Sequence, residues 1–454
     1  MTQSVILSLT ADVYQHEHVY AANVRYNDFK KEEGEHIPLN HDNDHYDEVE
    51  LYFHGDAHKL AYQGDEEEVT LPGTGETLKT VYKASKHKKA GTKKTVVERA
   101  DHNLSPQEVK AHWTEVAAAV QKELETWANL QCFTRKQRHG TRNMIDVRWV
   151  FKWKNELAVS SVADSTAKDK DWARVIRGRF CLRGLKDLDS EFLESYAGTA
   201  RKHSQRILCS EAVQRKWDVA TTDISKAFLQ GVTYQELAEL TGEPLRDVNF
   251  DLPKWCIPYL QRIPGFEDFD PTKEVLHCEK PGTGCNDAPR CFALKLAKVT
   301  QDLCKMKQCT VDHELCYLHE ENTQRLMALM AKHVDDLKIT GDKKTVIWIL
   351  QQIEQVFGKL KIEWNNFTNC GIKHVQNVDD KSITLDQIEY IKGIKTIQHG
   401  DLTTQDSQSF CSPEVHALYW SILGAINFAT LTRCDIAVFV SALQRVASKP
   451  QIIH

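Results

Sequence analysis

LMALMAKHVDDLKITG, the sequence of residues 326–341, decides the fold of this chain. Two mostly apolar runs flank the adjacent acids Asp335 and Asp336. Apolar runs that are joined by a short polar tip are typical of a β-hairpin. We therefore predict two antiparallel strands with both aspartates at their connection.

The adjacent aspartates suggest a metal site. Like charges a few ångströms apart repel each other unless a cation compensates them. At a turn both carboxylates can reach one site, and Asp223, at the end of a predicted strand over residues 217–223, can supply a third. Such hard oxygen ligands suit Mg²⁺. Spacing alone nevertheless favours the competing interpretation, an ordinary acidic turn on the surface.

A helix start is encoded at Ser105-Pro106-Gln107-Glu108. Serine at the N-cap, proline at the first helical position and glutamate three residues after the serine form a capping box. An apolar stripe at steps of three and four follows and predicts a single helix of about 25 residues. The stripe consists of Val109, Trp113, Val116, Val120, Leu124 and Trp127.

The elements that follow mix strands with helices. Residues 145–153 alternate between apolar and polar or basic side chains, which predicts a half-buried strand with a basic outer face. A second strand, with Arg174, Arg177, Arg179 and Arg183 near it, is expected to pair with it. Helical patterns cover residues 204–214, 291–306, 344–357 and 413–430. The order of these elements predicts an α+β fold.

Composition limits the classes of function. A formal net charge of −6 gives no overall basic signature, so any nucleic-acid surface must be local. The 13 cysteines form no CxxC pair, and the first residues lack a signal-peptide pattern, which predicts a reduced, intracellular protein in the cytoplasm or nucleus. The apolar stretch 420–431 is interrupted by polar residues and too short to cross a membrane.

The first part of the chain differs in character from the rest. Residues 12–68 are acidic and rich in histidine, and residues 79–99 are basic. We predict that residues 1–104 form a largely disordered linker and that residues 105–454 form the folded unit. The histidines fit a solvated segment better than a metal site, and the basic run could equally contact phosphates or remain solvated.

Three motifs, in order, resemble the reverse transcriptase domain of copia-type LTR retrotransposon Pol polyproteins. Residues 223–231, DISKAFLQG, resemble the first polymerase motif, and residues 333–336, HVDD, resemble the third. Between them, residues 280–290, KPGTGCNDAPR, are similar to a Gly-x-x-Gln-Ala-Pro-Arg segment. Further similarities upstream and downstream extend the resemblance over residues 105–450. They lie at residues 148–152, 196–200, 385–391, 423–425 and 432–436.

This resemblance implies a right-hand polymerase fold with fingers, palm and a partial thumb or connection. It implies an RNA-directed DNA polymerase whose Asp223, Asp335 and Asp336 hold two Mg²⁺ ions, with Mn²⁺ as the alternative. The expected partners are an RNA or DNA template, a primer and deoxynucleoside triphosphates. The oligomeric state stays open.

The resemblance also implies residues that bind the substrates. The expected nucleotide-binding residues are Ile224, Phe228, Arg179, Arg183 and Asp287. The expected nucleic-acid-binding residues are His333, Lys152, Lys154 and Arg290. Phe228 would exclude a 2′-hydroxyl, and the two arginines would grip the triphosphate because guanidinium binds phosphate bidentately. Core packing for Phe228, and a plain solvated surface for the arginines and lysines, are the alternatives.

Several positions depart from the family pattern. Asp287 stands where glutamine is usual, which should bring a negative charge near a polyanion, and His333 replaces an aromatic residue. Cys434 replaces a proline, and the sequence stops at His454, where the family continues into ribonuclease H. We therefore expect a piece of a polyprotein, and a non-catalytic remnant that only binds nucleic acid is the second hypothesis. A two-metal nuclease or nucleotidyl cyclase is the third, but it does not predict Phe228.

Overall fold

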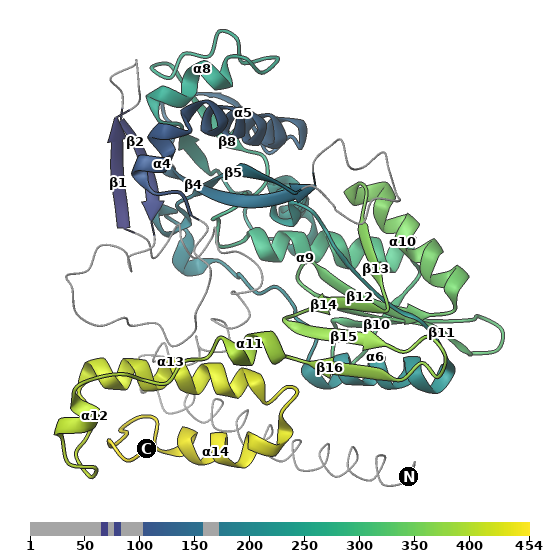
Figure 1. Cartoon of the computed structure of the whole chain (residues 1–454). Helices are drawn as coiled ribbons and strands as arrows, with labels where there is room; N and C mark the ends of the chain where they lie inside the picture. The colour runs from purple at the N-terminus through teal and green to yellow at the C-terminus, as the bar shows by residue number, and fades with distance from the viewer. Residues whose placement is uncertain (1–64, 71–76, 83–102, 158–171) are drawn as a thin grey trace. The chain divides into compact units, whose positions relative to one another are not determined.

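A computed structural model of the chain describes residues 65–70, 77–82, 103–157 and 172–454 (Figure 1). All of them belong to one contact unit, Glu50–His454. The predicted linker over residues 1–104 therefore lies mostly outside the described residues. The fold is α+β, as predicted, and its strands form three sheets of seven, six and three strands.

The capping box at the start of the folded unit is present. The amide of Glu108 donates to Ser105 Oγ over 3.3 Å, and the amide of Ser105 donates to Glu108 Oε2 over 2.8 Å. The prediction of a single long helix is wrong, because helix α4 (Pro106–Ala111) and helix α5 (Trp113–Asn129) are separated at His112. At this break, the His112 ring lies edge-on to the Trp153 ring, with 5.0 Å between ring centroids. The spacing of apolar residues along a helix cannot predict such a contact with a strand that is distant in the sequence.

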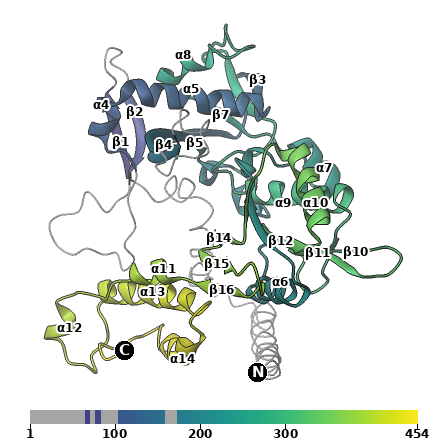
Figure 2. The ribbon, with the colours of Figure 1, turned by 45° about the vertical axis from the view of Figure 1, so that its right-hand side comes forward.

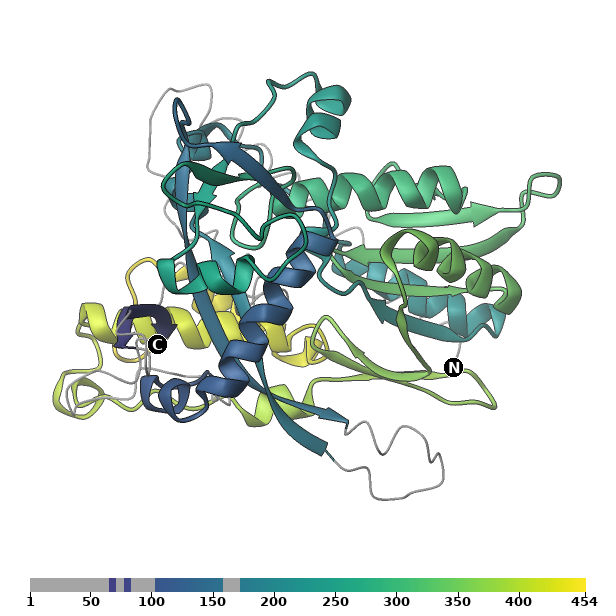
Figure 3. The ribbon, with the colours of Figure 1, turned by 90° about the horizontal axis from the view of Figure 1, so that it is seen from above.

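The seven-stranded sheet is built on a long antiparallel ribbon. Strand β4 (Met144–Leu157) pairs with β5 (Trp172–Leu182) from Val147 opposite Leu182 to Leu157 opposite Trp172, which confirms the predicted pairing. Helix α5 lies across this ribbon (Figure 3). The other strands are β1 (Asp65–Thr70), β2 (Thr77–Tyr82), β3 (Phe133–Gln137), β7 (Asn249–Asp251) and β8 (Glu274–Cys278).

Strands β1 and β2 lie inside the segment that we predicted to be a disordered linker. They pair antiparallel with each other, and Thr80 of β2 also pairs with Trp149 of β4. The predicted linker therefore contains these two strands, and its largely disordered character over residues 1–104 stays a prediction. The backbone hydrogen bonds of a strand come from its neighbour and do not depend on a hydrophobic sequence, so composition does not reveal such a pair.

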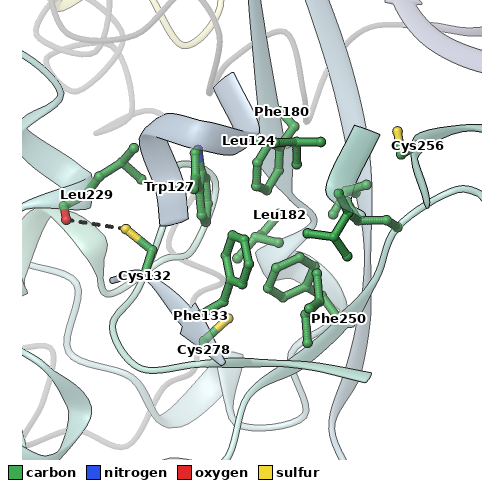
Figure 4. Packing of buried hydrophobic residues seen from close by; sticks show 14 of the residues in the cluster. Leu124, Trp127, Cys132, Phe133, Phe180, Leu182, Leu229, Phe250, Cys256 and Cys278 are labelled. Carbon is green, nitrogen blue, oxygen red and sulfur yellow. Dashed lines mark hydrogen bonds between the residues drawn. The ribbon is translucent and has the colours of Figure 1, made fainter. Parts of the chain in front are cut away.

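Aromatic side chains form the core between α5 and this sheet (Figure 4). The Trp127 ring stacks on Phe180 with 3.9 Å between centroids, and Phe250 meets Phe133 edge-to-face at 5.8 Å. Trp127 also fills the space beside Gly282, where an added Cβ would lie 1.9 Å from its ring. Only glycine therefore fits at this point of the Lys280–Arg290 segment.

The six-stranded sheet carries the predicted hairpin. Strand β11 (Leu326–His333) pairs antiparallel with β12 (Asp336–Gly341), and Val334 takes the left-handed conformation with φ 54° at the turn. The strand order is β13-β6-β12-β11-β10-β9. The remaining strands are β6 (Val219–Asp223), β9 (Lys307–Gln308), β10 (Leu315–His319) and β13 (Lys361–Trp364).

Helices cover both faces of the six-stranded sheet (Figure 2). Helix α9 (Ala288–Lys298), which continues into a π-helical turn at Val299–Leu303, and α10 (Lys343–Phe357) pack on one face. Helix α6 (Lys202–Arg215) packs on the other face. The predicted helices therefore exist, although α9 begins earlier than the apolar pattern suggested. Its start at Ala288 places Pro289 in the first turn, where a missing amide costs nothing.

The rest of the chain adds a small sheet and short helices. The sheet consists of β14 (Asn366–Asn369), β15 (Ile372–Gln376) and β16 (Ile383–Asp386). The further helices are α7 (Tyr234–Thr241), α8 (Ile257–Leu260), α11 (Ile388–Lys392), α12 (Asp401–Thr404), α13 (Pro413–Ala429) and α14 (Ala437–Arg445). Within the described ranges, no helix has the length and apolar character that a membrane span requires.

Candidate active site

Four polar residues form a row across adjacent strands of the six-stranded sheet. Asp336 of β12 lies opposite His333 of β11 on one side and opposite Asp223 of β6 on the other. Asp223 in turn lies opposite Lys361 of β13. Residues directly opposite each other in an antiparallel pair project from the same face and are about 5 Å apart at Cβ. The row therefore brings two of the three predicted carboxylates together on one face.

The third carboxylate belongs to the turn beside this row. The amide of Ile224, which follows Asp223, donates to the carbonyl of Asp335 over 3.2 Å. This bond ties the segment after β6 to the tip of the hairpin. Asp223 is exposed, and Asp335 and Asp336 are half-buried. The backbone therefore gathers all three predicted aspartates, although they are far apart in the sequence.

The donor atoms at this place suit a hard divalent cation, because carboxylate oxygens are the ligands that Mg²⁺ prefers. The side chains of the three aspartates are not arranged to coordinate a metal ion. In the part of the chain that the structure describes, no three His, Cys, Asp or Glu side chains converge as metal ligands would. The metal site thus stays a prediction, supported by the chemistry of the donors and by the strand register.

Phe228 and Ile224 lie beside the aspartates but face the interior. Phe228 is half-buried and packs against the apolar cores of both large sheets. Ile224 is buried in the core beneath α9 and α10. Much of the Phe228 ring is thus used for core packing, the alternative that we left open for this residue. The side chain of Ile224 is buried, so Ile224 can contact a nucleotide only through its backbone.

Three cations, from β5 and from the segment after β6, act electrostatically on one buried acid of α5. Glu123 of α5 accepts a hydrogen bond from Trp127 Nε1 over 3.2 Å. Burial raises the pKa of Glu123, while the positive charges of Lys226, Arg179 and Arg177 act against this rise. Burial also lowers the pKa of Lys226, whose Nζ donates to the hydroxyl of Thr126.

This cation group contains one predicted residue, Arg179, and two that sequence reasoning missed, Arg177 and Lys226. Signals for both were present in the sequence. Arg177 lies two residues before Arg179 and therefore on the same face of β5. Lys226 lies three residues after Asp223, inside the first polymerase motif. Arg183 is not part of the group, because it pairs with Asp146 over 3.1 Å.

Asp287 occupies a buried ion-pair network. Its side chain is 1% exposed, and Arg246 Nε lies 3.1 Å from its Oδ2. The same arginine pairs with the buried Asp187 and stands over the Tyr234 ring at 5.3 Å. Burial raises the pKa of Asp287, and Arg246 opposes this rise. We expected an uncompensated negative charge that faces the nucleotide; the structure instead compensates this charge inside the protein.

The predicted nucleic-acid-binding residues divide into two groups. Arg290 is 11% exposed and pairs with Glu243 through both guanidinium nitrogens, over 3.0 and 2.7 Å, and His333 is buried. Neither presents a free surface. Lys152 and Lys154 of β4 are more accessible, and Lys152 lies opposite Arg177, so these cations share one face of the ribbon.

Comparisons with known proteins agree with the resemblance found in the sequence. No protein-family model matches the chain. The sequence is similar to the retrovirus-related Pol polyprotein from transposon RE1 of Arabidopsis thaliana, with 24% identity over 280 residues. It is also similar to that from transposon RE2 of the same organism, with 23% identity over 276 residues. Each match covers 58% of this chain but 17% of the relative, so the chain spans a small part of either polyprotein.

Solved structures with some similarity come from polymerases at low identity. A foamy viral protease-reverse transcriptase in complex with double-stranded DNA has 12% identity and a TM-score of 0.35, covering 79% of this chain and 46% of that chain. A telomerase from Candida tropicalis in complex with a telomeric RNA fragment has 10% identity and a TM-score of 0.35, covering 74% and 57%. The curated relatives are Pol polyproteins, which agrees with the family that the sequence motifs resemble.

Proposed function

We propose that this chain is the reverse transcriptase part of a retrotransposon polyprotein, which transfers nucleotides onto a primer 3′-hydroxyl. The observation that carries the proposal is the strand register that makes Asp223 and Asp336 direct neighbours, with Asp335 held beside them by the Ile224 amide. An ordinary acidic turn requires no such third acid on a separate strand.

Asp223, Asp335 and Asp336 are the residues that would hold two Mg²⁺ ions, with Mn²⁺ as the alternative. When bound, such ions acidify the primer hydroxyl and neutralise charge on the leaving pyrophosphate. The residues of the chain contribute position: the β6–β12 pairing fixes the carboxylates on two rigid strands, which hold a site more accurately than loops.

The cation group beside Glu123 is suited to the triphosphate of the incoming nucleotide. The positive charges of Lys226, Arg179 and Arg177 all act on Glu123, so they lie within electrostatic range of one place. Guanidinium groups bind phosphate oxygens in pairs, and a nearby lysine adds a point charge. The part of the Phe228 ring that stays accessible would limit the space at the sugar, and Lys152 and Lys154 would contact the template backbone.

Primer extension on a poly(rA) template with an oligo(dT) primer tests the proposal. We expect extension with Mg²⁺ or Mn²⁺, and a loss of at least two orders of magnitude in Asp223→Asn and Asp336→Asn, because transition-state charge would lose its compensation. Asp379→Asn, which changes an exposed acid outside the row, is the matched control. Extension that survives Asp336→Asn would refute the site.

A non-catalytic module that only binds nucleic acid is the second candidate. One observation favours it: among the described residues no set of side chains is already arranged to ligate a metal. The same assay separates the two candidates when it is combined with a binding measurement. Wild-type protein that binds primer and template but does not extend the primer, with either metal, supports this second candidate and contradicts the first.

A further inference from the structure

Exposed apolar side chains gather on two segments that lie outside the candidate active site. The first segment is residues 185–196, which follow β5, and the second is residues 240–245, which run from the end of α7 toward β7. The exposed side chains are Leu185, Leu188, Phe192, Tyr196, Leu240 and Leu245. Phe192 is the most exposed of them, at 86%. An apolar group of this size on a soluble domain commonly marks an interaction site.

Ion pairs hold the two segments against each other, so these side chains belong to one surface. Arg246, which directly follows the second segment, pairs with the buried Asp187 of the first. Arg290 pairs with Glu194 of the first segment over 3.0 Å and with Glu243 of the second over 2.7 Å. We call this surface the apolar-acidic patch.

The charge of the patch indicates the chemistry of its partner. Asp189, Glu191, Glu194 and Glu239 are exposed around the apolar side chains, and the one exposed lysine of the first segment, Lys186, pairs with Asp146 over 3.0 Å. The arginines that pair with patch acids, Arg246 and Arg290, are largely buried beneath them. A surface with outward carboxylates repels the phosphates of nucleic acid. The patch therefore fits a polypeptide that combines apolar and basic side chains.

Helix α14 has that combination. Val438 and Phe439 are 68% and 67% exposed, which is unusual for large apolar residues on a helix of a folded unit. Val438, Ala442 and Arg445 follow one another at steps of four and three and therefore share a face. Arg445, the last residue of the helix, and Lys449, four residues beyond it, are exposed. The stripe is apolar along its length and basic at its C-terminal end.

We propose that the chain self-associates, with α14 of one copy packed on the apolar-acidic patch of a second copy. Phe439 and Val438 would cover Phe192 and its apolar neighbours, and Arg445 and Lys449 would meet the surrounding carboxylates. A helix that lays its apolar face on a complementary surface is a common recognition mode. The contact joins two different surfaces, so it closes as a dimer when both copies make it reciprocally and otherwise extends into a chain.

Sedimentation of the full chain over a concentration series tests the proposal. We expect a mass that rises above the monomer with concentration, and a dissociation constant at least tenfold higher in Phe192→Ser and in Phe439→Ser. Val378→Ser, at another exposed apolar residue, should leave the constant unchanged. Because both test positions are exposed, the far-ultraviolet circular dichroism and thermal midpoint of each variant should match the wild type.

Charge reversal distinguishes this contact from other arrangements. Glu191→Lys with Glu239→Lys, and separately Arg445→Glu with Lys449→Glu, should each weaken association, and the chain with all four changes should recover it. A monomer at every soluble concentration overturns the proposal. The proposal is also overturned if Phe439→Ser weakens association while Phe192→Ser does not, because this result would indicate contact between two α14 helices. Variants that expand the monomer without changing its mass also overturn it, because they would indicate contact within one chain. The readout is mass, so it stands or fails independently of polymerase activity.

Discussion

Arg246→Met offers the sharpest test of the buried network, because it removes one cation from between two buried carboxylates. Arg246 is 7% exposed in its side chain, and Asp187 and Asp287 are each 1% exposed. Removing one partner of a buried ion pair costs about 3–5 kcal/mol, since the remaining charge stays desolvated. Two acids lose the same partner here, so we expect a loss of at least about 4 kcal/mol in the free energy of unfolding.

The loss should depend on pH with a defined sign. Without Arg246, the main opposition to the effect of burial is lost, so the pKa of Asp287 rises further above its unfolded value. A group whose folded pKa is raised destabilises the fold as the pH climbs through the unfolded value. The difference between Arg246→Met and the wild type should therefore be largest near neutral pH and shrink as the pH falls and Asp287 becomes protonated.

Urea denaturation followed by circular dichroism measures both effects. Lys392→Ala is the control, because it breaks an ion pair with Glu389 whose side chains are 66% and 86% exposed and should change stability by less than about 1 kcal/mol. Adding Asp187→Asn and Asp287→Asn to Arg246→Met should restore part of the loss. A cost below about 1 kcal/mol for Arg246→Met, or one that is independent of pH, would refute the reasoning.

Three further predictions concern other parts of the fold. Trp127→Ala should cost about 3–5 kcal/mol by emptying the core beside Phe180 and Gly282, and an unchanged urea midpoint would contradict this. Burial lowers the pKa of His374 from 6.5 to about 3, so stability should be full above pH 6.5 and fall as the pH drops toward 3; His374→Gln should flatten this part of the stability profile. Lys226→Met should raise KM for the nucleotide about tenfold with little change in primer–template affinity, and equal weakening of both would contradict a triphosphate role.

Local patterns were sufficient for much of the fold. The capping box at Ser105, the alternation along β4 and the paired apolar runs around Asp335 and Asp336 each depend on neighbours in the chain, and each was predicted correctly. Other features involve partners that are distant in the sequence. The break at His112 coincides with a contact with Trp153, and β1 and β2 obtain their hydrogen bonds from each other and from β4.

The candidate site shows the same division. The order of the motifs suggested that Asp223 belongs with Asp335 and Asp336. The strand register makes Asp223 and Asp336 neighbours, and the Ile224 amide ties Asp335 to the segment after Asp223. The surroundings of Asp287 could not be predicted, because its compensating cation, Arg246, lies outside every motif. Arg290 and His333 were expected at a surface, yet their burial depends on Glu243 and on strand packing that no local pattern reveals. Their roles in binding nucleic acid stay predictions.

The row of His333, Asp336, Asp223 and Lys361 makes the site sensitive to the length of its strands. Because successive residues of a strand alternate between faces, an insertion or deletion of one residue between Val219 and Asp223 would move Asp223 to the opposite face of the sheet. If the change lies between Val219 and Ala220, it would also turn Ala220, now in the core under α9 and α10, toward α6. A substitution changes one side chain. The insertion or deletion of one residue would disrupt both the carboxylate row and the packing of the core. When diverged copies of such a sequence are compared, an unchanged number of residues in β6 and in β12 would therefore be a better sign of function than the identity of any single residue.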